Sequence, residues 1–306
     1  MSQYTTERGI NVMDIDIFRK QYELADNAPP PVDMDEYFRA EKSKYLSLLD
    51  SGLIEKEYQK FFELNPAFMP GAYELIGGTT SHIPVMNALI SQPTLGEEKI
   101  RKPDFMWLAK DSICFCPVFI EIERPSKQEF RQDEAARAVF TQAAGQIKQW
   151  KAILNSIDGR KSFYDRYSIP QELRDLKFTP QYLLVFGRRA EYEGNTWLTS
   201  LRAEEQSDDF RVMSFDRLAN PDRNVYDMVT CKVVNGNYEV ICIPPTYVYR
   251  PCIASLLKKY SGFYEAIDRM RYVSSERKTF LKMRYQYWET YGSKNNIGLS
   301  NSSDKE

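Results

Sequence analysis

Apolar and polar positions alternate toward the end of the run from Cys114 to Glu123, a pattern typical of a β-strand. Successive side chains of a strand point to opposite faces, so Glu121 and Glu123 share one face while Ile120 and Ile122 share the other. Two neighbouring carboxylates on an apolar strand carry a large desolvation cost unless a cation or a hydrogen-bond network compensates them. The two glutamates are therefore the first candidates for chemistry.

A second strand is predicted from Phe105 to Leu108, joined to the first through the turn-forming residues 110–112. If the two strands pair as a hairpin, Asp104 lies opposite the stretch that ends in Glu121, and three acids meet at one end of the hairpin. Mg²⁺ prefers a few carboxylates and keeps several waters that a phosphate substrate displaces. The pattern therefore favours a metal site formed by Asp104, Glu121 and Glu123 over three separately solvated acids.

The segment from about Ser51 to Leu64 has helical periodicity and stops at Asn65-Pro66. Its predicted apolar stripe consists of Ile54, Tyr58, Phe61 and Phe62. Glu57 lies beside this stripe, so its carboxylate either reaches solvent or joins a metal site with Asp104 and Glu121. The pattern leaves both interpretations open.

A longer helix is predicted from about Gln128 to Leu154, directly after the strand that carries the glutamates. Gln142 and Gln146 border its apolar row one turn apart. That row consists of Val139, Ala143, Ile147, Trp150 and Leu154. A helix in this position would cover the sheet face near the acids.

Further strands are expected from Tyr182 to Phe186 and from Phe210 to Phe215. A hairpin is expected from Met228 to Val234 and from Tyr238 to Ile243, turned by Asn235-Gly236. Two more helices are predicted, one from about Asp35 and one from about Ser275 to Tyr291. Strands that alternate with helices predict an α/β fold, a mixed sheet with helices on both faces.

Composition narrows the class of protein. A chain of 306 residues with 42% hydrophobic residues can bury a large core, and a net charge of −2 does not indicate a generally basic protein. Five irregularly spaced cysteines argue against a disulfide framework and fit a reducing cytosol, and Cys114 and Cys116 are expected to be core thiols. Without an apolar run of about 20 residues or a signal-peptide core, we expect a cytoplasmic protein with no membrane contact.

The chain has one histidine, His82. This count excludes histidine-rich metal sites and leaves any Ser-His-Asp triad dependent on that single residue. The surrounding segment, Thr79 to Pro84, is predicted to be a loop, which favours a surface or structural role for His82. Chemistry is therefore expected to depend on carboxylates.

These residues together resemble a known superfamily. The series is Glu57 and Gln59 before Asn65-Pro66, then Pro103-Asp104, then Glu121-Ile122-Glu123-Arg124-Pro125, then Gln142 to Trp150. In this order and context it resembles the PD-(D/E)xK nucleases, in particular the nuclease domain of the Shedu anti-phage defence proteins, over about residues 46–218. The resemblance implies a restriction-endonuclease-like fold and a Mg²⁺-dependent endonuclease acting on DNA, with Mn²⁺ able to substitute. It makes Glu57 the upstream helix acid, Asp104 and Glu121 the metal ligands, and Gln146 with Trp150 the helix motif.

The chain departs from the superfamily pattern at one position, where Glu123 replaces the usual lysine. That lysine helps to orient the attacking water and stabilises charge in the transition state, which a glutamate cannot do. Glu123 is instead a general base or an additional metal ligand, or Lys127 or Lys148 supplies the missing cation; the spacing does not distinguish these two lysines. A further alternative is that cleavage has been lost and the fold only binds nucleic acid or partner proteins.

Cations for the phosphate backbone must come from outside the acidic site. The nearest in sequence are Arg124, Lys127, Arg188 and Arg189. Residues 256–284 contain eight bases, three acids and several tyrosines, so they either track a nucleic-acid backbone or form the solvated face of two helices. A glycosidase interpretation of Glu121 and Glu123 fits poorly, because such acids must flank a sugar bond from opposite sides.

Four regions are predicted. Residues 1–45 form an acidic arm with the stiff link Pro29-Pro30-Pro31, 46–218 the nuclease-like domain, 219–297 an appendage of hairpin and helices, and 298–306 a disordered tail. The aromatic terminal helix either packs on the core or forms an oligomer contact, and a homo-oligomer, dimer or tetramer, is expected. The leading hypothesis is a metal-dependent DNA endonuclease of bacterial defence, and the alternative is a catalytically silent binding module.

Overall fold

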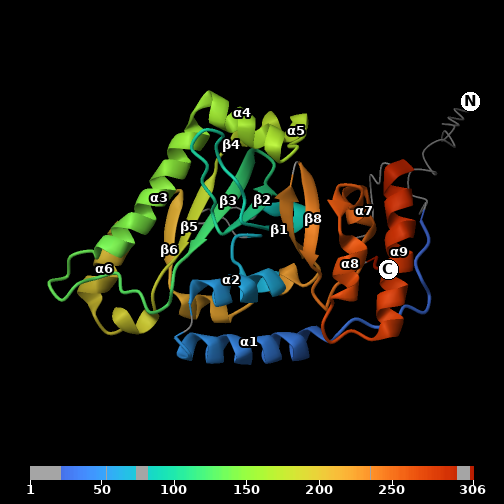
Figure 1. Ribbon diagram of the computed structural model, residues 1–306, viewed down its shortest axis with the longest axis horizontal. Helices are drawn as coiled ribbons and strands as arrows, with labels where there is room; N and C mark the ends of the chain where they lie inside the picture. The colour runs from blue at the N-terminus through green and yellow to red at the C-terminus, as the bar shows by residue number, and fades with distance from the viewer. Residues whose placement is uncertain (1–21, 53, 74–81, 235, 295–303) are drawn as a thin grey trace, which may run out of the picture.

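The computed structural model describes residues 22–52, 54–73, 82–234, 236–294 and 304–306 (Figure 1). In chain order its α-helices (α), 3₁₀ helices (η) and strands (β) are α1 Met34–Asp50, α2 Glu55–Leu64, η3 Pro66–Phe68, β1 Ile83–Ser91, β2 Phe105–Lys110, β3 Cys114–Ile122, α3 Ala138–Asn155, α4 Ile157–Arg166, α5 Gln171–Arg174, β4 Lys177–Phe178, β5 Gln181–Val185, η4 Arg189–Glu191, α6 Thr196–Glu204, β6 Phe210–Met213, η5 Phe215–Ala219, η6 Arg223–Val225, β7 Val229–Val234, β8 Asn237–Cys242, η7 Pro251–Ile253, α7 Ala254–Leu257, β9 Tyr260–Ser261, α8 Phe263–Asp268 and α9 Ser275–Lys294.

The strands form one mixed sheet in the order β6-β5-β3-β2-β1-β7-β8-β9, with β4 paired to β3. The β1–β2–β3 part is antiparallel, whereas β5 and β6 continue parallel to β3 and β7 lies parallel to β1. The predicted α/β fold with a mixed sheet is confirmed.

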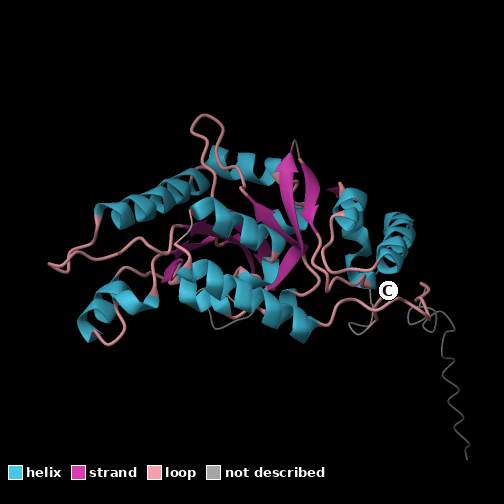
Figure 2. Cartoon of the chain, turned by 60° about the horizontal axis from the view of Figure 1, so that its bottom comes forward, coloured by secondary structure: helices cyan, strands magenta, loops and turns pink. Residues whose placement is uncertain are grey.

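Helices cover both faces of the sheet, as expected for a sheet with two apolar faces. On one face, α1 and α2 pack with Val118, Ile120 and Ile122 of β3; these helices come forward in Figure 2. On the other face, α3 packs through Ile147 and Trp150 with Phe119 of β3. The strand that carries the acids is therefore buried from both sides, which fixes the direction of each of its side chains.

The hairpin of β2 and β3 has the predicted pairing. Phe105 lies opposite Ile120, which places Asp104 opposite Glu121. The Asp104 amide donates to the carbonyl of Ile120 at 3.1 Å, and the Ile122 amide donates to Asp104 Oδ2 at 2.8 Å. One end of the hairpin thus brings these two carboxyl groups together.

The helix predicted from about Gln128 begins ten residues later, at Ala138. The carboxylate of Glu191 accepts hydrogen bonds from the amides of Glu129 and Phe130, at 3.0 and 2.8 Å, and Glu134 adopts a positive φ of 64°. The hydrogen bonds to Glu191 hold residues 126–137 as a loop. The left-handed conformation of Glu134 also prevents a continuous helix there. The expected apolar row is correct except at its start, where Phe140 is buried and Val139 is 38% exposed.

One central strand was not predicted at all. β1 pairs with both β2 and β7 and so joins the predicted hairpins into a single sheet. His82, expected in a loop, directly precedes this strand and is 1% exposed, with Nε2 2.8 Å from the carbonyl oxygen of Gly71. Because its side chain is buried, the surface alternative is wrong.

The regions predicted outside the nuclease-like domain also contribute to the core. α1 begins within the predicted arm and buries Tyr37, Phe38, Tyr45 and Leu49, while β7 and β8 belong to the main sheet. In the predicted tail, residues 298–303 lie outside the described part, but Glu306 is buried and pairs with Arg277. The sheet and its two cores therefore extend across the boundaries predicted at 45/46 and 218/219. Among the described residues, every helix is too short or too polar to cross a bilayer.

Candidate active site

Asp104 and Glu121 form the centre of the site at the open end of the β2–β3 hairpin. Their carboxyl groups lie close enough to act on each other's pKa, and Glu121 is only 8% exposed. No described residue donates a hydrogen bond to Glu121 Oε2, although this oxygen is buried. Buried polar atoms normally have partners, so an unpaired carboxylate oxygen beside a second acid is chemically suited to bind a cation.

Burial is the main reason why both carboxyl groups hold their protons more tightly than usual. It raises the pKa of Asp104 to about 7, against the hydrogen bond from the Ile122 amide, and nearby Glu55 and Glu123 raise it further. Burial also raises the pKa of Glu121, and the charges of Asp104 and Glu123 raise it further. Without a cation, the two acids therefore share a proton near neutral pH.

Glu123 is turned toward a lysine. Its carboxylate, 7% exposed as a residue, forms an ion pair with Lys127, which lies four positions further along the chain. A turn in which the Lys127 amide donates to the carbonyl of Arg124 at 3.0 Å brings the lysine back to the strand end. The ligand oxygens of Asp104, Glu121 and Glu123 do not all lie within 4.8 Å of one another. The structure thus brings together the first two predicted metal ligands and sets Glu123 beside an ammonium group.

The acid that α2 contributes is Glu55, not Glu57. Glu55 lies in the first turn of the helix, is half-buried, and has a raised pKa because of burial and the charge of Glu123, which Lys127 and Arg124 oppose. Glu57 is exposed. The exposed side chain of Glu57 fits the first of the two interpretations that the sequence leaves open, in which its carboxylate reaches solvent. The buried stripe begins after Ile54, which is the N-cap and is 57% exposed, whereas Tyr58 and Phe62 are buried.

Gln59 and Glu63 continue the row that Glu55 begins, at intervals of one helical turn. Gln59 Nε2 lies 3.2 Å from Ser91 Oγ and 3.5 Å from the carbonyl oxygen of Asp104, and Ser91 Oγ donates to Glu63 at 2.6 Å. The Oε1 atom of Gln59 is buried and unpaired among the described residues. This row supports the backbone of Asp104 from the α2 side, a role that the i, i+4, i+8 spacing of polar residues could have indicated.

The other predicted site residues are more dispersed. Gln146 is half-buried on α3, one turn before the fully buried Trp150. Arg124 and Arg189 are exposed, so both are available to a phosphate backbone. Arg188 instead forms ion pairs with Asp216 at 3.0 Å and Asp50 at 3.7 Å. A phosphate contact by Arg188 would require these pairs to open.

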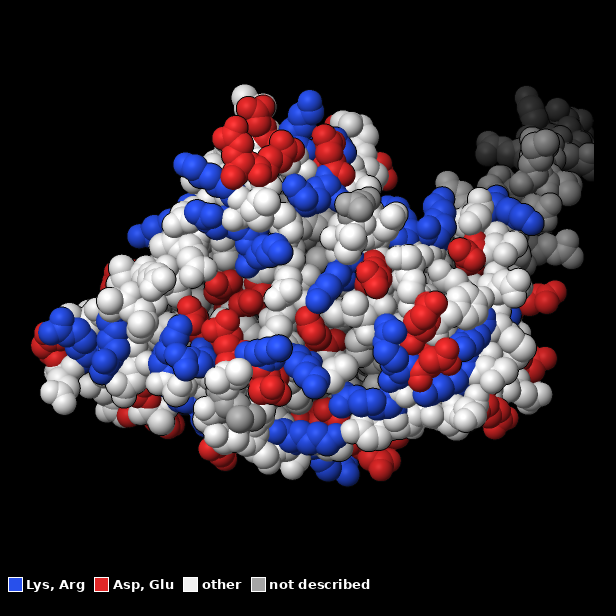
Figure 3. Space-filling model, viewed as in Figure 1, with Lys and Arg blue, Asp and Glu red and all other residues white. Residues whose placement is uncertain are grey.

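The basic segment 256–284 is largely engaged within the protein. Arg277 is 1% exposed, and Lys282 pairs with Asp268 at 2.7 Å. Lys278 donates to the carbonyl of Asp268 at 2.8 Å. The stronger candidate for an electrostatic surface lies elsewhere: on the face shown in Figure 3, Lys and Arg side chains border a hollow between α3 and α2 in which acidic side chains gather.

The donor set fits a hard divalent cation. Asp104 and Glu121 offer carboxylate oxygens only, one of them buried and unpaired, and Mg²⁺ selects oxygen ligands. Glu55 and Glu123 add negative charge near the same place. Asp104 and Glu121 would hold the ion directly, and water would complete its coordination.

Replacement of Glu55 by Gln is expected to weaken Mg²⁺ binding and slow any cleavage about tenfold or more, because it removes one charge from the cluster. Glu57→Gln is the matched control, since Glu57 lies in the same helix but is exposed. The measurement is a Mg²⁺ titration in which binding is detected as a rise in the melting temperature. An equal effect of both substitutions would exclude a specific contribution from Glu55.

The raised pKa values predict an unusual dependence of stability on pH. The folded protein holds protons on Asp104 and Glu121 that the unfolded chain releases, so the stability that these protons contribute is lost as pH rises from about 4, through about 7 for Asp104 and through about 10 for Glu121. Mg²⁺ competes with the same protons, so its stabilisation should grow over that range. Melting curves with and without Mg²⁺ test both trends against Asp104→Asn, in which both should be reduced. Trends that persist in this variant would assign the effect to other groups.

Comparison with known proteins supports the same region. A family model described as "Shedu protein SduA, C-terminal" matches residues 52–219, more than half of the chain and the part from α2 to η5. A search of curated proteins found no match. All the site residues discussed above from Glu55 to Arg189 fall inside the matched range. The chain therefore belongs to the family of the C-terminal domain of the Shedu protein SduA.

Proposed function

We propose that the protein is a Mg²⁺-dependent endonuclease that hydrolyses phosphodiester bonds of DNA in defence against phage. Membership of the Shedu family suggests a nuclease-like role in anti-phage defence. The observation that carries the metal-dependent hydrolysis is the buried pair of Asp104 and Glu121 with its unpaired oxygen. Two acids held together at this cost are explained by a divalent cation that offsets their charge.

The Mg²⁺ ion would neutralise charge on the scissile phosphate and lower the pKa of the attacking water. Residues of the protein itself orient the two acids and supply a positively charged side chain beside them. The Ile122 amide orients Asp104, while Gln59 contacts the backbone of the same residue. Lys127 places its ammonium group at the strand end, where it would stabilise negative charge that develops on the phosphate.

Lys127 therefore takes over the role of the lysine that Glu123 replaces. A lysine directly on the strand would reach the phosphate from position 123. In this chain the loop after Pro125 brings the ammonium group of Lys127 back to the end of the strand, where its ion pair with Glu123 holds it. Lys148, the other candidate, lies exposed on α3. Exposed Arg124 and Arg189 would contact the phosphate backbone of the substrate.

Incubation of the purified protein with supercoiled plasmid tests the proposal. With Mg²⁺ or Mn²⁺ we expect nicked or linear products, and with EDTA none. Linear single-stranded DNA and RNA run in parallel identify the substrate. A folded protein that shifts DNA on a gel but cuts none of these substrates with any divalent ion would support the silent binding module instead.

A further inference from the structure

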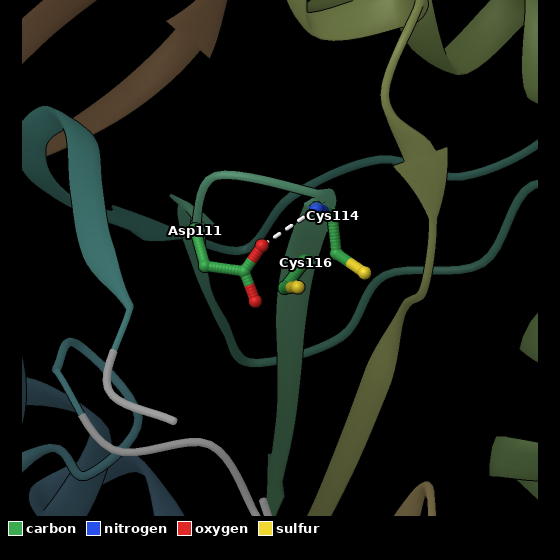
Figure 4. A group of neighbouring side chains, drawn as sticks. All are labelled: Asp111, Cys114 and Cys116. Carbon is green, nitrogen blue, oxygen red and sulfur yellow. Dashed lines mark hydrogen bonds between the residues drawn. The ribbon is translucent and has the colours of Figure 1, made fainter. Parts of the chain in front are cut away.

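The opposite end of the β2–β3 hairpin carries a second group of chemically active side chains. Asp111 follows β2, and Cys114 and Cys116 lie on β3 (Figure 4). Each residue offers one ligand atom, and the three atoms all lie within 4.8 Å of one another. The nuclease-like site is at the other end of the same two strands, so the two groups are separate.

Local structure fixes the Asp111 carboxylate. Oδ1 accepts hydrogen bonds from the amides of Ile113 at 2.7 Å and Cys114 at 2.6 Å; Figure 4 shows the second of these. Both bonds lower the pKa of Asp111, so this carboxylate is charged. No described residue hydrogen-bonds to Oδ2, which leaves that oxygen for an external partner. Metal-ligating carboxylates are commonly oriented by hydrogen bonds of this kind.

The two thiols share one face of β3, because two positions separate them along the strand. All five cysteines are reduced. Cys116 is 1% exposed, as expected for a core thiol, whereas Cys114 is partly exposed. Asp111 is partly exposed as well. A small ion can therefore reach the group from solvent and meet two sulfur atoms and one oxygen.

Register places a histidine beside the group. Ile83 pairs with Lys110, so His82 and Asp111 are the next residues along β1 and β2, and the charge of His82 acts on Asp111. The hydrogen-bond contact of Nε2 with the carbonyl of Gly71 is the arrangement that orients a histidine near a metal. The neighbourhood thus contains both residue types that bind zinc most often in proteins.

We propose that Asp111, Cys114 and Cys116 form a binding site for a thiophilic divalent ion of the Zn²⁺ class. Binding would replace the proton of each thiol by a metal–sulfur bond and release two protons to solvent. Tetrahedral geometry with Zn–S bonds of about 2.3 Å separates the sulfurs by about 3.8 Å, so a small side-chain rotation of Cys114 would close the group. Water or His82 would fill the fourth position. The ion would clamp the turn of the hairpin whose other end carries Asp104 and Glu121.

Co²⁺ is the probe, because thiolate ligands give it an intense near-ultraviolet charge-transfer band that oxygen ligands do not. Titration of the reduced, metal-free protein should produce this band with saturation near one equivalent, and excess Mg²⁺ should not remove it. Zn²⁺ should displace the Co²⁺ and abolish the band. Asp104→Asn, at the other end of the hairpin, should leave the titration unchanged. The experiment therefore succeeds or fails independently of nuclease activity.

Cys114→Ser is expected to abolish or strongly weaken the band, and Cys252→Ser is the matched control because Cys252 is an exposed thiol outside the group. A second measurement uses wild-type protein alone: Zn²⁺ should slow alkylation of Cys114, identified by peptide mass, at least tenfold, and leave Cys252 unaffected. This readout stands even if a variant fails to fold. No charge-transfer band in folded wild-type protein, a band that survives Cys114→Ser, or equal protection of both cysteines would overturn the proposal.

Discussion

Asp104→Asn is expected to lower Mg²⁺-dependent plasmid cleavage by about a thousandfold or more. A metal ion contributes several kcal/mol of charge stabilisation, and each 1.36 kcal/mol corresponds to a tenfold change in rate. Asn keeps the size of the side chain and can accept the hydrogen bond from the Ile122 amide, so the hairpin should keep its register. Glu121→Gln should have an effect of similar size, since Glu121 supplies the unpaired buried oxygen. Initial cleavage rates at several Mg²⁺ concentrations provide the measurement.

The same substitutions should stabilise the protein when no metal is present. Each removes one of two acids that are buried side by side, and the neutral amide has no charge to desolvate. The melting temperature without Mg²⁺ should rise, and the further rise caused by Mg²⁺ in the wild type should be lost. Glu57→Gln serves as the exposed control. Cleavage that survives both substitutions, or a lower metal-free melting temperature in both, would exclude this pair as the metal site.

The central pair was predictable because it depends on local patterns. Alternation along β3 fixed the shared face of Glu121 and Glu123, and a short turn fixed the register that places Asp104 opposite Glu121. Long periodic segments such as α2 and α3 were also found, because their buried stripes repeat over several turns. The fold class follows from the same alternation of strands and helices.

The errors arise where distant contacts override local patterns. β1 has an irregular register between Pro84 and Leu89, so it lacks a continuous alternation, and its pairing with β7 joins segments about 140 residues apart. The start of α3 is delayed by Glu191, a residue from beyond β5 that binds the backbone of the preceding loop. No feature of residues 126–137 alone specifies that partner.

The choice between Glu55 and Glu57 shows the same limit within a single helix. Both are acids of the first turn of α2. A shift of two positions in the assumed apolar stripe therefore decides which of them lies on the buried side of the helix and which faces solvent. Gln59 and Glu63, one and two turns beyond Glu55, mark the polar row that contacts Ser91 and the backbone of Asp104. The ion pair of Lys127 with Glu123 likewise depends on tertiary structure, since only the folded loop brings these two residues together.

Lys127→Met is expected to slow cleavage by about 10²- to 10³-fold while Mg²⁺ binding stays equal or becomes tighter. The ammonium group acts on charge that develops during the reaction, and one such interaction is worth about that factor. Its removal also leaves the carboxylate of Glu123 uncompensated next to the metal site, which favours a cation. Lys148→Met is the matched control, because Lys148 is an exposed lysine on α3. Single-turnover rates at saturating Mg²⁺, with a Mg²⁺ titration of the melting temperature, separate the two effects.

A charge exchange extends this test. In the double variant Glu123→Lys with Lys127→Glu, the ammonium group lies on the strand and the carboxylate in the loop, which preserves the ion pair and places a lysine where the PD-(D/E)xK nucleases carry one. If the position of the ammonium group is what matters, the double variant should recover at least about a tenth of wild-type activity, whereas Lys127→Glu alone should be nearly inactive because it adds a further acid to the cluster. Full activity of Lys127→Met would instead show that the reaction needs no cation from this loop, and an inactive but folded double variant would indicate that the carboxylate of Glu123 is itself required.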